Sequence, residues 1–139
     1  MIILDTNVLS AIIAPVPAVE VIQWLDTQKG VELCLNAITV FEARSGIEGL
    51  VDSKKRRGLE RAFDYALANV FGDRVVPFDH DAAFAAAALA AKRKRTGQPQ
   101  DIRDTQIAGI ALSRKATLAT RNIRHFSDLN VPVIDPWSA

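Results

Sequence analysis

The sequence predicts an α/β fold, specifically a three-layer α/β/α sandwich with a mostly parallel sheet of about five strands. Short apolar segments of strand length alternate along the chain with longer segments whose apolar residues recur at helical spacing. That alternation is typical of strands joined by crossover helices. The first apolar segment contains no polar alternation, and a continuously apolar strand indicates burial on both faces, as in the middle layer of a sandwich.

The expected strands are short apolar segments bounded by polar or turn-forming residues. The first covers residues 2–5 and ends at an acid, Asp5. The others are expected at residues 32–35, 74–77, 117–120 and 131–134. Because these strands alternate with helices, they are expected to form one mostly parallel sheet.

Six helices are expected between these strands. Pro15 and Pro17 end a short first helix that follows Asp5, and Gly30 closes a second helix. The remaining helices are expected at about residues 38–50, 53–71, 79–94 and 102–113. The last of them is apolar almost all round over residues 107–112, which indicates a buried helix.

Length and composition indicate one folded domain, residues 1–139. A chain of 139 residues has the usual size of a single domain, and 49% hydrophobic residues exclude a disordered chain. No apolar stretch approaches the roughly 20 residues of a membrane span, and the first lacks the basic leader of a signal peptide. A cytoplasmic protein without membrane contact is therefore expected. The single cysteine, Cys34, lies in an apolar run and is interpreted as a small core residue.

The charge is nearly balanced overall but unevenly distributed. A formal net charge of +1 gives no global argument for nucleic-acid binding. Residues 54–57 and 92–95 are basic blocks, and Arg121 and Arg124 follow a late strand. Such runs are usually solvated helix faces, and they become phosphate-binding candidates only where the neighbouring chemistry requires phosphate.

Three acids are expected at one edge of the sheet. Asp5 ends the first strand, and Glu42 lies in the first turns of the helix after the second strand. Asp104 begins the helix that must run antiparallel to strand 117–120, so it lies beside that strand's carboxyl end, where Asn122 also emerges. Open parallel sheets bind ligands at this edge.

Each acid also has a purely structural explanation. Asp5 can cap the following helix, Asp104 can satisfy the free N–H groups and the dipole of its own helix, and Glu42 can be ordinary helix surface. Converging carboxylates repel one another and need a counter-ion when all are ionised. An oxygen-only cluster without His or Cys suits Mg²⁺ or Mn²⁺ rather than zinc.

The acidic segments resemble, in order, the motifs of PIN-domain ribonucleases, specifically the VapC-type toxins of bacterial toxin–antitoxin pairs. The matching segments are residues 1–8, 37–46, 104–111 and 117–122, followed by the ending 131–136. One departure is Asn122, which stands where many members carry a fourth acid. Because Asn is a poorer cation ligand, a second metal held by the protein is in question. Asp101 either compensates or caps its helix.

The resemblance implies a metal-dependent endoribonuclease that hydrolyses RNA phosphodiester bonds with Mg²⁺ or Mn²⁺. Asp5, Glu42 and Asp104 are then the catalytic metal ligands, with Glu42 alternatively the base for the attacking water. Residues that would orient the carboxylates are Thr6, Asn7, Thr120 and Asn122, although Asn7 can equally be a cap at the start of the first helix. Arg121 and Arg124 are candidates for binding flanking phosphates.

The resemblance also implies partners. It predicts a homodimer, and a small antitoxin whose C-terminal segment covers the active-site groove and commonly inserts an Arg among the acids. A higher assembly with the antitoxin is expected to contact DNA only through the antitoxin.

Two alternatives remain open from the sequence. Asn122 is compatible with a catalytically weak PIN-fold module that acts as corepressor or scaffold with its antitoxin. The segment around Asp5 also resembles the nucleophile loop of haloacid-dehalogenase-type phosphatases, although Asn7 stands where those enzymes carry a second acid. His80 is interpreted as exposed turn chemistry. His125 is interpreted as a surface residue, with a substrate contact as the alternative.

Overall fold

The sheet of the computed structural model, which describes residues 1–139, has five parallel strands in the order β3-β2-β1-β4-β5. The strands are β1 (Ile2–Leu4), β2 (Leu33–Asn36), β3 (Val75–Val76), β4 (Thr117–Ala119) and β5 (Val133–Ile134). The helices are α1 (Thr6–Ile13), α2 (Val19–Asp26), α3 (Ala37–Glu48), α4 (Lys54–Tyr65), α5 (His80–Arg95) and α6 (Ile102–Arg114). A π-helical turn, η1 (Ala66–Val70), extends α4, and a 3-10 turn, η2 (Ile123–Phe126), follows β4.

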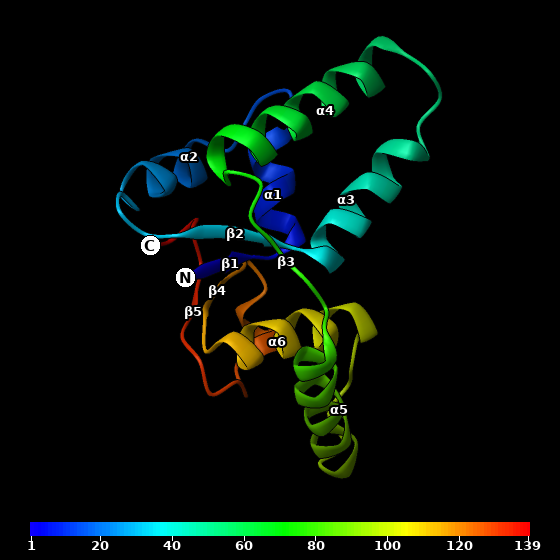
Figure 1. The fold of residues 1–139 in the computed structure, drawn as a ribbon, viewed down its shortest axis with the longest axis vertical. Coiled ribbons are helices and arrows are strands. Elements are labelled where there is room, and N and C mark those ends of the chain that lie inside the picture. The colour runs from blue at the N-terminus through cyan, green and yellow to red at the C-terminus, as the bar shows by residue number, and fades with distance from the viewer.

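Helices cover both faces of the sheet, as the sequence predicts. Figure 1 shows α1 to α4 on one side of the strands and α5 and α6 on the other. Successive strand residues point to opposite faces: Leu4 joins the core under α1 and α4, whereas Ile3 joins the core under α6. The three-layer arrangement is thereby confirmed.

The direction of strand addition reverses beside β1. The chain passes from β1 outward to β2 and β3, and then returns to place β4 and β5 on the other side of β1. Leu4 is in register with Ala119, and the Asp5 N–H donates to the Ala119 carbonyl at 2.9 Å. Asp5 and Thr120 therefore leave neighbouring strands at the point where doubly wound sheets bind their ligands.

Most element boundaries differ from the expected ones by one or two residues, for local reasons, whereas α2 ends at Asp26, earlier than the expected end near Gly30. Asp5 belongs to the cap of α1 rather than to β1, because its carboxylate accepts the Thr6 N–H. Asn36 both ends β2 and caps α3 through the Thr39 N–H. The last strand begins at Val133 rather than two residues earlier.

The basic blocks are not simply solvated faces. Arg56 binds Glu48 and Glu60, and Arg57 binds Asp52. The prediction is wrong at Arg93, which lies in the second block yet is 4% exposed. Its α5 face packs against α6 and η2, and Asp128 pairs with its guanidinium.

The remaining expectations about the core agree with the structure. Cys34 is buried in the core beneath α6, and burial raises the pKa of its thiol. His80 is exposed at the start of α5 and packs against Phe84. None of the helices has the length and apolarity that crossing a bilayer requires.

Candidate functional site

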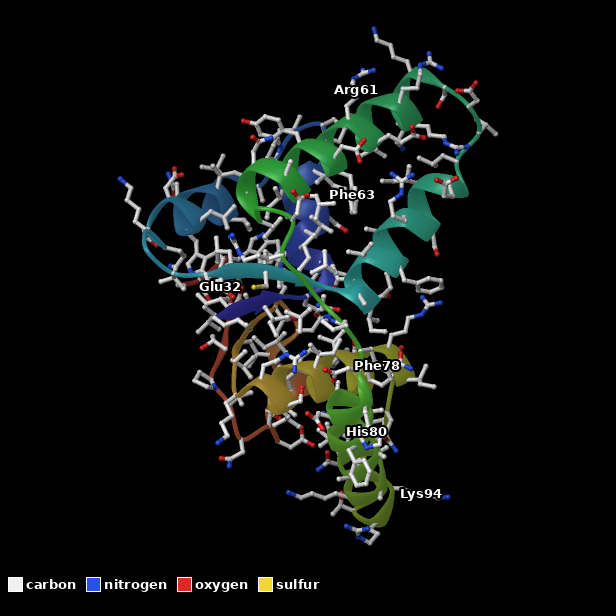
Figure 2. All side chains as sticks on the ribbon, viewed as in Figure 1. Glu32, Arg61, Phe63, Phe78, His80 and Lys94 are labelled. Atoms are coloured by element: carbon white, nitrogen blue, oxygen red, sulfur yellow. The ribbon has the colours of Figure 1, made fainter.

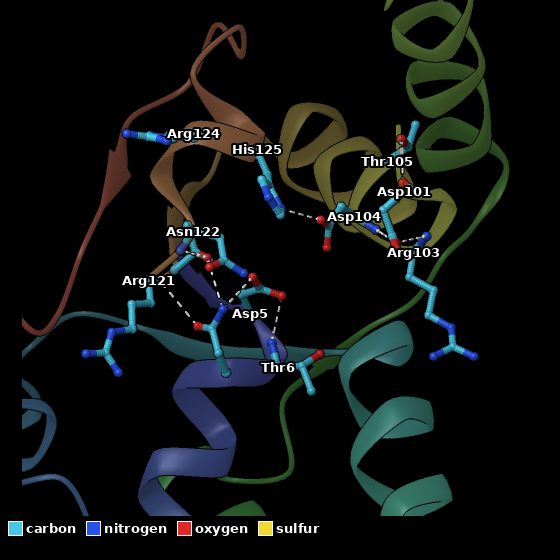
Figure 3. Close-up of polar contacts among 12 residues, drawn as sticks. Asp5, Thr6, Asp101, Arg103, Asp104, Thr105, Arg121, Asn122, Arg124 and His125 are labelled. Carbon is cyan, nitrogen blue, oxygen red and sulfur yellow. Dashed lines mark hydrogen bonds and ion pairs between the residues drawn. The ribbon is translucent and has the colours of Figure 1, made fainter. Parts of the chain in front are cut away.

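Asp5 is a buried carboxylate held by neutral donors. It is 3% exposed. Its Oδ1 accepts the Thr6 N–H at 2.7 Å, and its Oδ2 accepts the Thr120 hydroxyl at 2.7 Å and the Asn7 amide at 3.2 Å (Figure 3). Burial raises the pKa of Asp5, and the nearby charges of Asp104 and Glu42 raise it further, although the bonds from Thr120 and Thr6 oppose the shift. Ionising Asp5 is therefore costly until a cation arrives.

The residues after β4 complete the hydrogen bonds around Asp5. The Thr120 hydroxyl donates to Asp5 and accepts the Asn122 N–H at 3.0 Å. The Asn7 amide lies 3.5 Å from the same hydroxyl, and its carbonyl accepts the Arg121 N–H at 3.1 Å. Asn7 and Thr120 thus contact the carboxylate directly. Asn122 takes part through its backbone N–H.

Glu42 is joined to Asp5 through Thr6. The Thr6 hydroxyl donates to Glu42 Oε1 at 2.7 Å, while the Thr6 N–H donates to Asp5. Glu42 Oε2 has only a long ion pair, 3.6 Å from Arg103 Nη1. One residue at the start of α1 therefore sets the spacing of two acids from different elements.

Two fully buried residues that sequence reasoning missed fix the start of α3. The Asn36 amide donates to the Leu4 carbonyl and the Thr39 hydroxyl, both at 3.0 Å. The Thr39 hydroxyl lies 3.2 Å from the Thr6 hydroxyl. The available signal was the capping pattern of an Asn directly before a helix. These bonds tie the helix that carries Glu42 to the end of β1.

Asp104 lies in the first turn of α6, and its carboxylate points toward the edge where Asp5 lies (Figure 3). Asp101 caps this helix, since its Oδ1 accepts the N–H groups of Arg103 and Asp104. The capping alternative for Asp101 therefore holds. Asp104 Oδ2 lies 2.8 Å from His125 Nδ1.

The interpretation of His125 as a plain surface residue is incomplete. Its side chain is 56% exposed, yet its ring nitrogen contacts a candidate site acid. No sequence spacing signals this contact, because the two residues are 21 positions apart and meet only when η2 folds onto α6.

A polar cavity of about 550 Å³ opens beside Asp104 and His125. It lies between the end of α5, the start of α6 and η2, and Arg124 is on its wall. Arg121 lies elsewhere: its guanidinium stacks over the Trp137 ring at 4.7 Å. The two arginines predicted to hold phosphates thus have different surroundings.

The donor set fits a hard divalent cation. Asp5 is a buried carboxylate with no Arg or Lys in contact, and two further carboxylates raise its pKa. Oxygen ligands of this kind suit Mg²⁺ or Mn²⁺. As the side chains lie, no three His, Cys, Asp or Glu residues are close enough together to ligate one ion.

Comparison with known proteins gives a consistent result. The PIN domain family model matches residues 2–131. The chain is 35% identical over 137 residues to toxin FitB of Neisseria gonorrhoeae, with 99% of each protein covered. It is 34% identical to VapC ribonuclease Y4jK of Sinorhizobium fredii, covering 99% of this chain and 98% of that protein. The structure of FitAB bound to the DNA fragment IR36 superposes with a TM-score of 0.87, at 35% identity and coverage of 99% and 96%.

Proposed function

The chain belongs to the PIN-domain family, and we propose that it is a metal-dependent endoribonuclease toxin of the VapC type, inhibited by a cognate antitoxin. The observation that carries the proposal is Asp5, a buried carboxylate without a cationic partner beside two other acids at the switch point of the sheet. The relative Y4jK is a VapC ribonuclease by name. The phosphatase alternative is not retained, because the family match spans nearly the whole chain.

Asp5, Glu42 and Asp104 would hold Mg²⁺ or Mn²⁺ after their side chains move closer together, because they are not near enough to ligate one ion as they lie in the structure. When bound, a divalent ion lowers the pKa of a water molecule and neutralises charge that develops on the phosphoryl group. Each carboxylate keeps one oxygen available. Asp104 Oδ2 is bonded to His125 and Oδ1 has no partner, while Glu42 Oε1 is bonded to Thr6 and Oε2 has only the long ion pair.

Asp5 follows the same pattern. A carboxylate oxygen has about two lone-pair sites, and Asp5 Oδ2 uses both on Thr120 and Asn7. Oδ1 accepts only the Thr6 N–H and retains one site. The hydrogen bonds thus fix the carboxylate and present one oxygen to a ligand. Glu42 is also suited to accept a proton from the attacking water, since its Oε2 receives no hydrogen bond and its side chain is partly exposed.

The partners belong to the same proposal. The FitAB structure contains DNA, and we expect this chain to form a homodimer that binds an antitoxin and reaches DNA only through it. Its own net charge of +1 supplies little attraction for DNA. A cationic antitoxin side chain entering beside Asp5 would provide the missing counter-charge and block the site.

Cleavage of RNA by the purified chain and by an Asp5→Asn variant tests the proposal. Mg²⁺- or Mn²⁺-dependent cleavage by the wild type is expected, and chelator should stop it. The rate of RNA cleavage by the variant should fall by more than about 100-fold, which is the largest loss expected from removing an outer-shell partner. Equal residual cleavage by both proteins would overturn the proposal. Absence of cleavage by either, with intact DNA binding of the antitoxin complex, would instead favour the corepressor alternative.

A further inference from the structure

The cavity beside Asp104 has the size and chemistry of a binding site for a polar ligand. Its volume of about 550 Å³ lies within the roughly 300–1,000 Å³ of ligand pockets. None of its nine lining residues is hydrophobic, so a ligand there would be surrounded by polar and charged side chains. Because Asp104 forms part of its wall, a ligand in the cavity would continue directly into the acidic site.

Arg124 is the available cation on the wall. It is exposed and belongs to none of the ion pairs of the chain. The other arginine of the cavity, Arg93, is occupied by Asp128. A free guanidinium can bind a phosphate group in a bidentate manner. Arg124 shares the wall with the carboxylates of Asp101 and Asp104, so a phosphate would bind on the Arg124 side of the cavity.

The wall that carries Arg124 is held rigidly. Arg93 donates to both oxygens of Asp128 at 2.9 and 2.8 Å, to the His125 carbonyl at 2.9 Å and to the Thr105 hydroxyl at 3.3 Å. These bonds attach η2 to α5 and α6 from beneath. The cavity is therefore formed before a ligand arrives, which reduces the entropic cost of binding.

The cavity wall also carries side-chain amides. Gln100 is anchored, because its amide donates to the Ala90 carbonyl at 3.2 Å. Gln98 is exposed, and only its backbone N–H is bonded, to the Arg93 carbonyl. A free amide offers both a donor and an acceptor, which are the groups that read the edge of an unpaired RNA base.

We propose that this cavity is a subsite for one nucleotide of the RNA next to the cleaved bond, with Arg124 on its phosphate and Gln98 on its base. The inference rests on the proposed ribonuclease function and adds the position and the chemistry of the substrate contact. Arg93 and Asp128 are positioning residues in this subsite.

Binding of a fluorescent single-stranded RNA oligonucleotide tests the phosphate contact. The full chain carrying Asp5→Asn, in chelator, keeps the RNA intact, and anisotropy compares Arg124→Ala with Arg61→Ala in that background. Arg61 is an exposed arginine of α4, in the opposite layer (Figure 2), so both variants remove one positive charge. Arg124→Ala should weaken binding about 10-fold and reduce the salt slope by about 0.7, the value for one phosphate of a single strand. Arg124→Lys should recover part of the affinity.

Cleavage by proteins with intact acids separates this proposal from the proposed function. Arg124→Ala should raise KM with little change in kcat, and Gln98→Ala should flatten the base preference at one position flanking the cut when cleavage ends are sequenced. If the wild type cleaves RNA but Arg124→Ala matches Arg61→Ala in both assays, the subsite is wrong and the ribonuclease stands. If Arg124→Ala weakens only the antitoxin complex, the cavity belongs to the protein partner and the subsite is overturned. If the wild type neither binds nor cleaves RNA, both proposals fall.

Discussion

Asp5 and Arg93 are equally buried charges with opposite surroundings. Asp5 is 3% exposed and Arg93 is 4% exposed. Arg93 meets a carboxylate through two short hydrogen bonds, and it lowers the pKa of Asp128. Asp5 meets only neutral donors, and its pKa is raised by burial and by two further acids. Burial of a charge alone therefore does not mark a functional site; the missing counter-charge does.

The largest expected effect is the loss of stability when Arg93 is replaced. Arg93→Ala leaves Asp128 without its partner and should lower the free energy of unfolding by about 3–5 kcal/mol, measured by urea denaturation at pH 7. The matched variant Arg56→Ala removes an arginine of α4 that takes part in more exposed ion pairs, with Glu48 and Glu60, and should cost at most about 1 kcal/mol. A loss for Arg93→Ala no larger than that of Arg56→Ala would contradict the structural role.

The same variant has a defined pH dependence. The folded pKa of Asp128 lies below its ordinary value of 3.8. The pair therefore stabilises the protein above that ordinary value, and the stabilisation is lost as the pH falls through the folded pKa. The difference between wild type and Arg93→Ala should be full at neutral pH and shrink below about pH 4.

At Asp5 we expect a smaller change in stability, with the opposite dependence on pH. Its folded pKa lies above the ordinary value of 3.8, so in chelator its stabilising contribution is present below that value and is lost as the pH rises through the folded pKa. At pH 7 Asp5→Asn should be at least as stable as the wild type. Added Mg²⁺ should stabilise the wild type alone, by about 2.7 kcal/mol at a concentration 100 times Kd.

Thermal unfolding of both proteins with increasing Mg²⁺ at pH 7 measures this difference. An equal gain in the two proteins would place the bound ion away from Asp5. A gain confined to the wild type would show that the bound ion supplies the positive charge that Asp5 lacks. Asp5 would then differ from Arg93, whose counter-charge is already part of the fold.

The contrast also explains what could be predicted from sequence. Asp5, Glu42 and Asp104 could be assigned to one edge because parallel connections fix the direction of every element. Arg93 could not be recognised, because a run of four basic residues has the pattern of a solvated face, and its partner Asp128 lies 35 positions away. The contact between His125 and Asp104 likewise depends on how η2 packs against α6.

The smallest expected effect concerns how Asp5 is oriented. Thr120→Val keeps the shape of a fully buried side chain but removes the hydroxyl that donates to Asp5 and accepts the Asn122 N–H. Stability should fall by about 1 kcal/mol, the net value of a typical hydrogen bond, while kcat for RNA should fall about 10-fold or more, as for loss of an outer-shell partner.

Thr117→Val is the control, because Thr117 lies at the amino end of the same strand, away from the acids. It should leave kcat unchanged at a similar or smaller cost in stability. If Thr120→Val lowered stability but left kcat and the response to Mg²⁺ intact, the hydroxyl would serve folding only. The neutral donors around Asp5 would then have a structural role only, as the Arg93 contacts do. The two buried charges would differ only in the presence of Glu42 and Asp104 near Asp5.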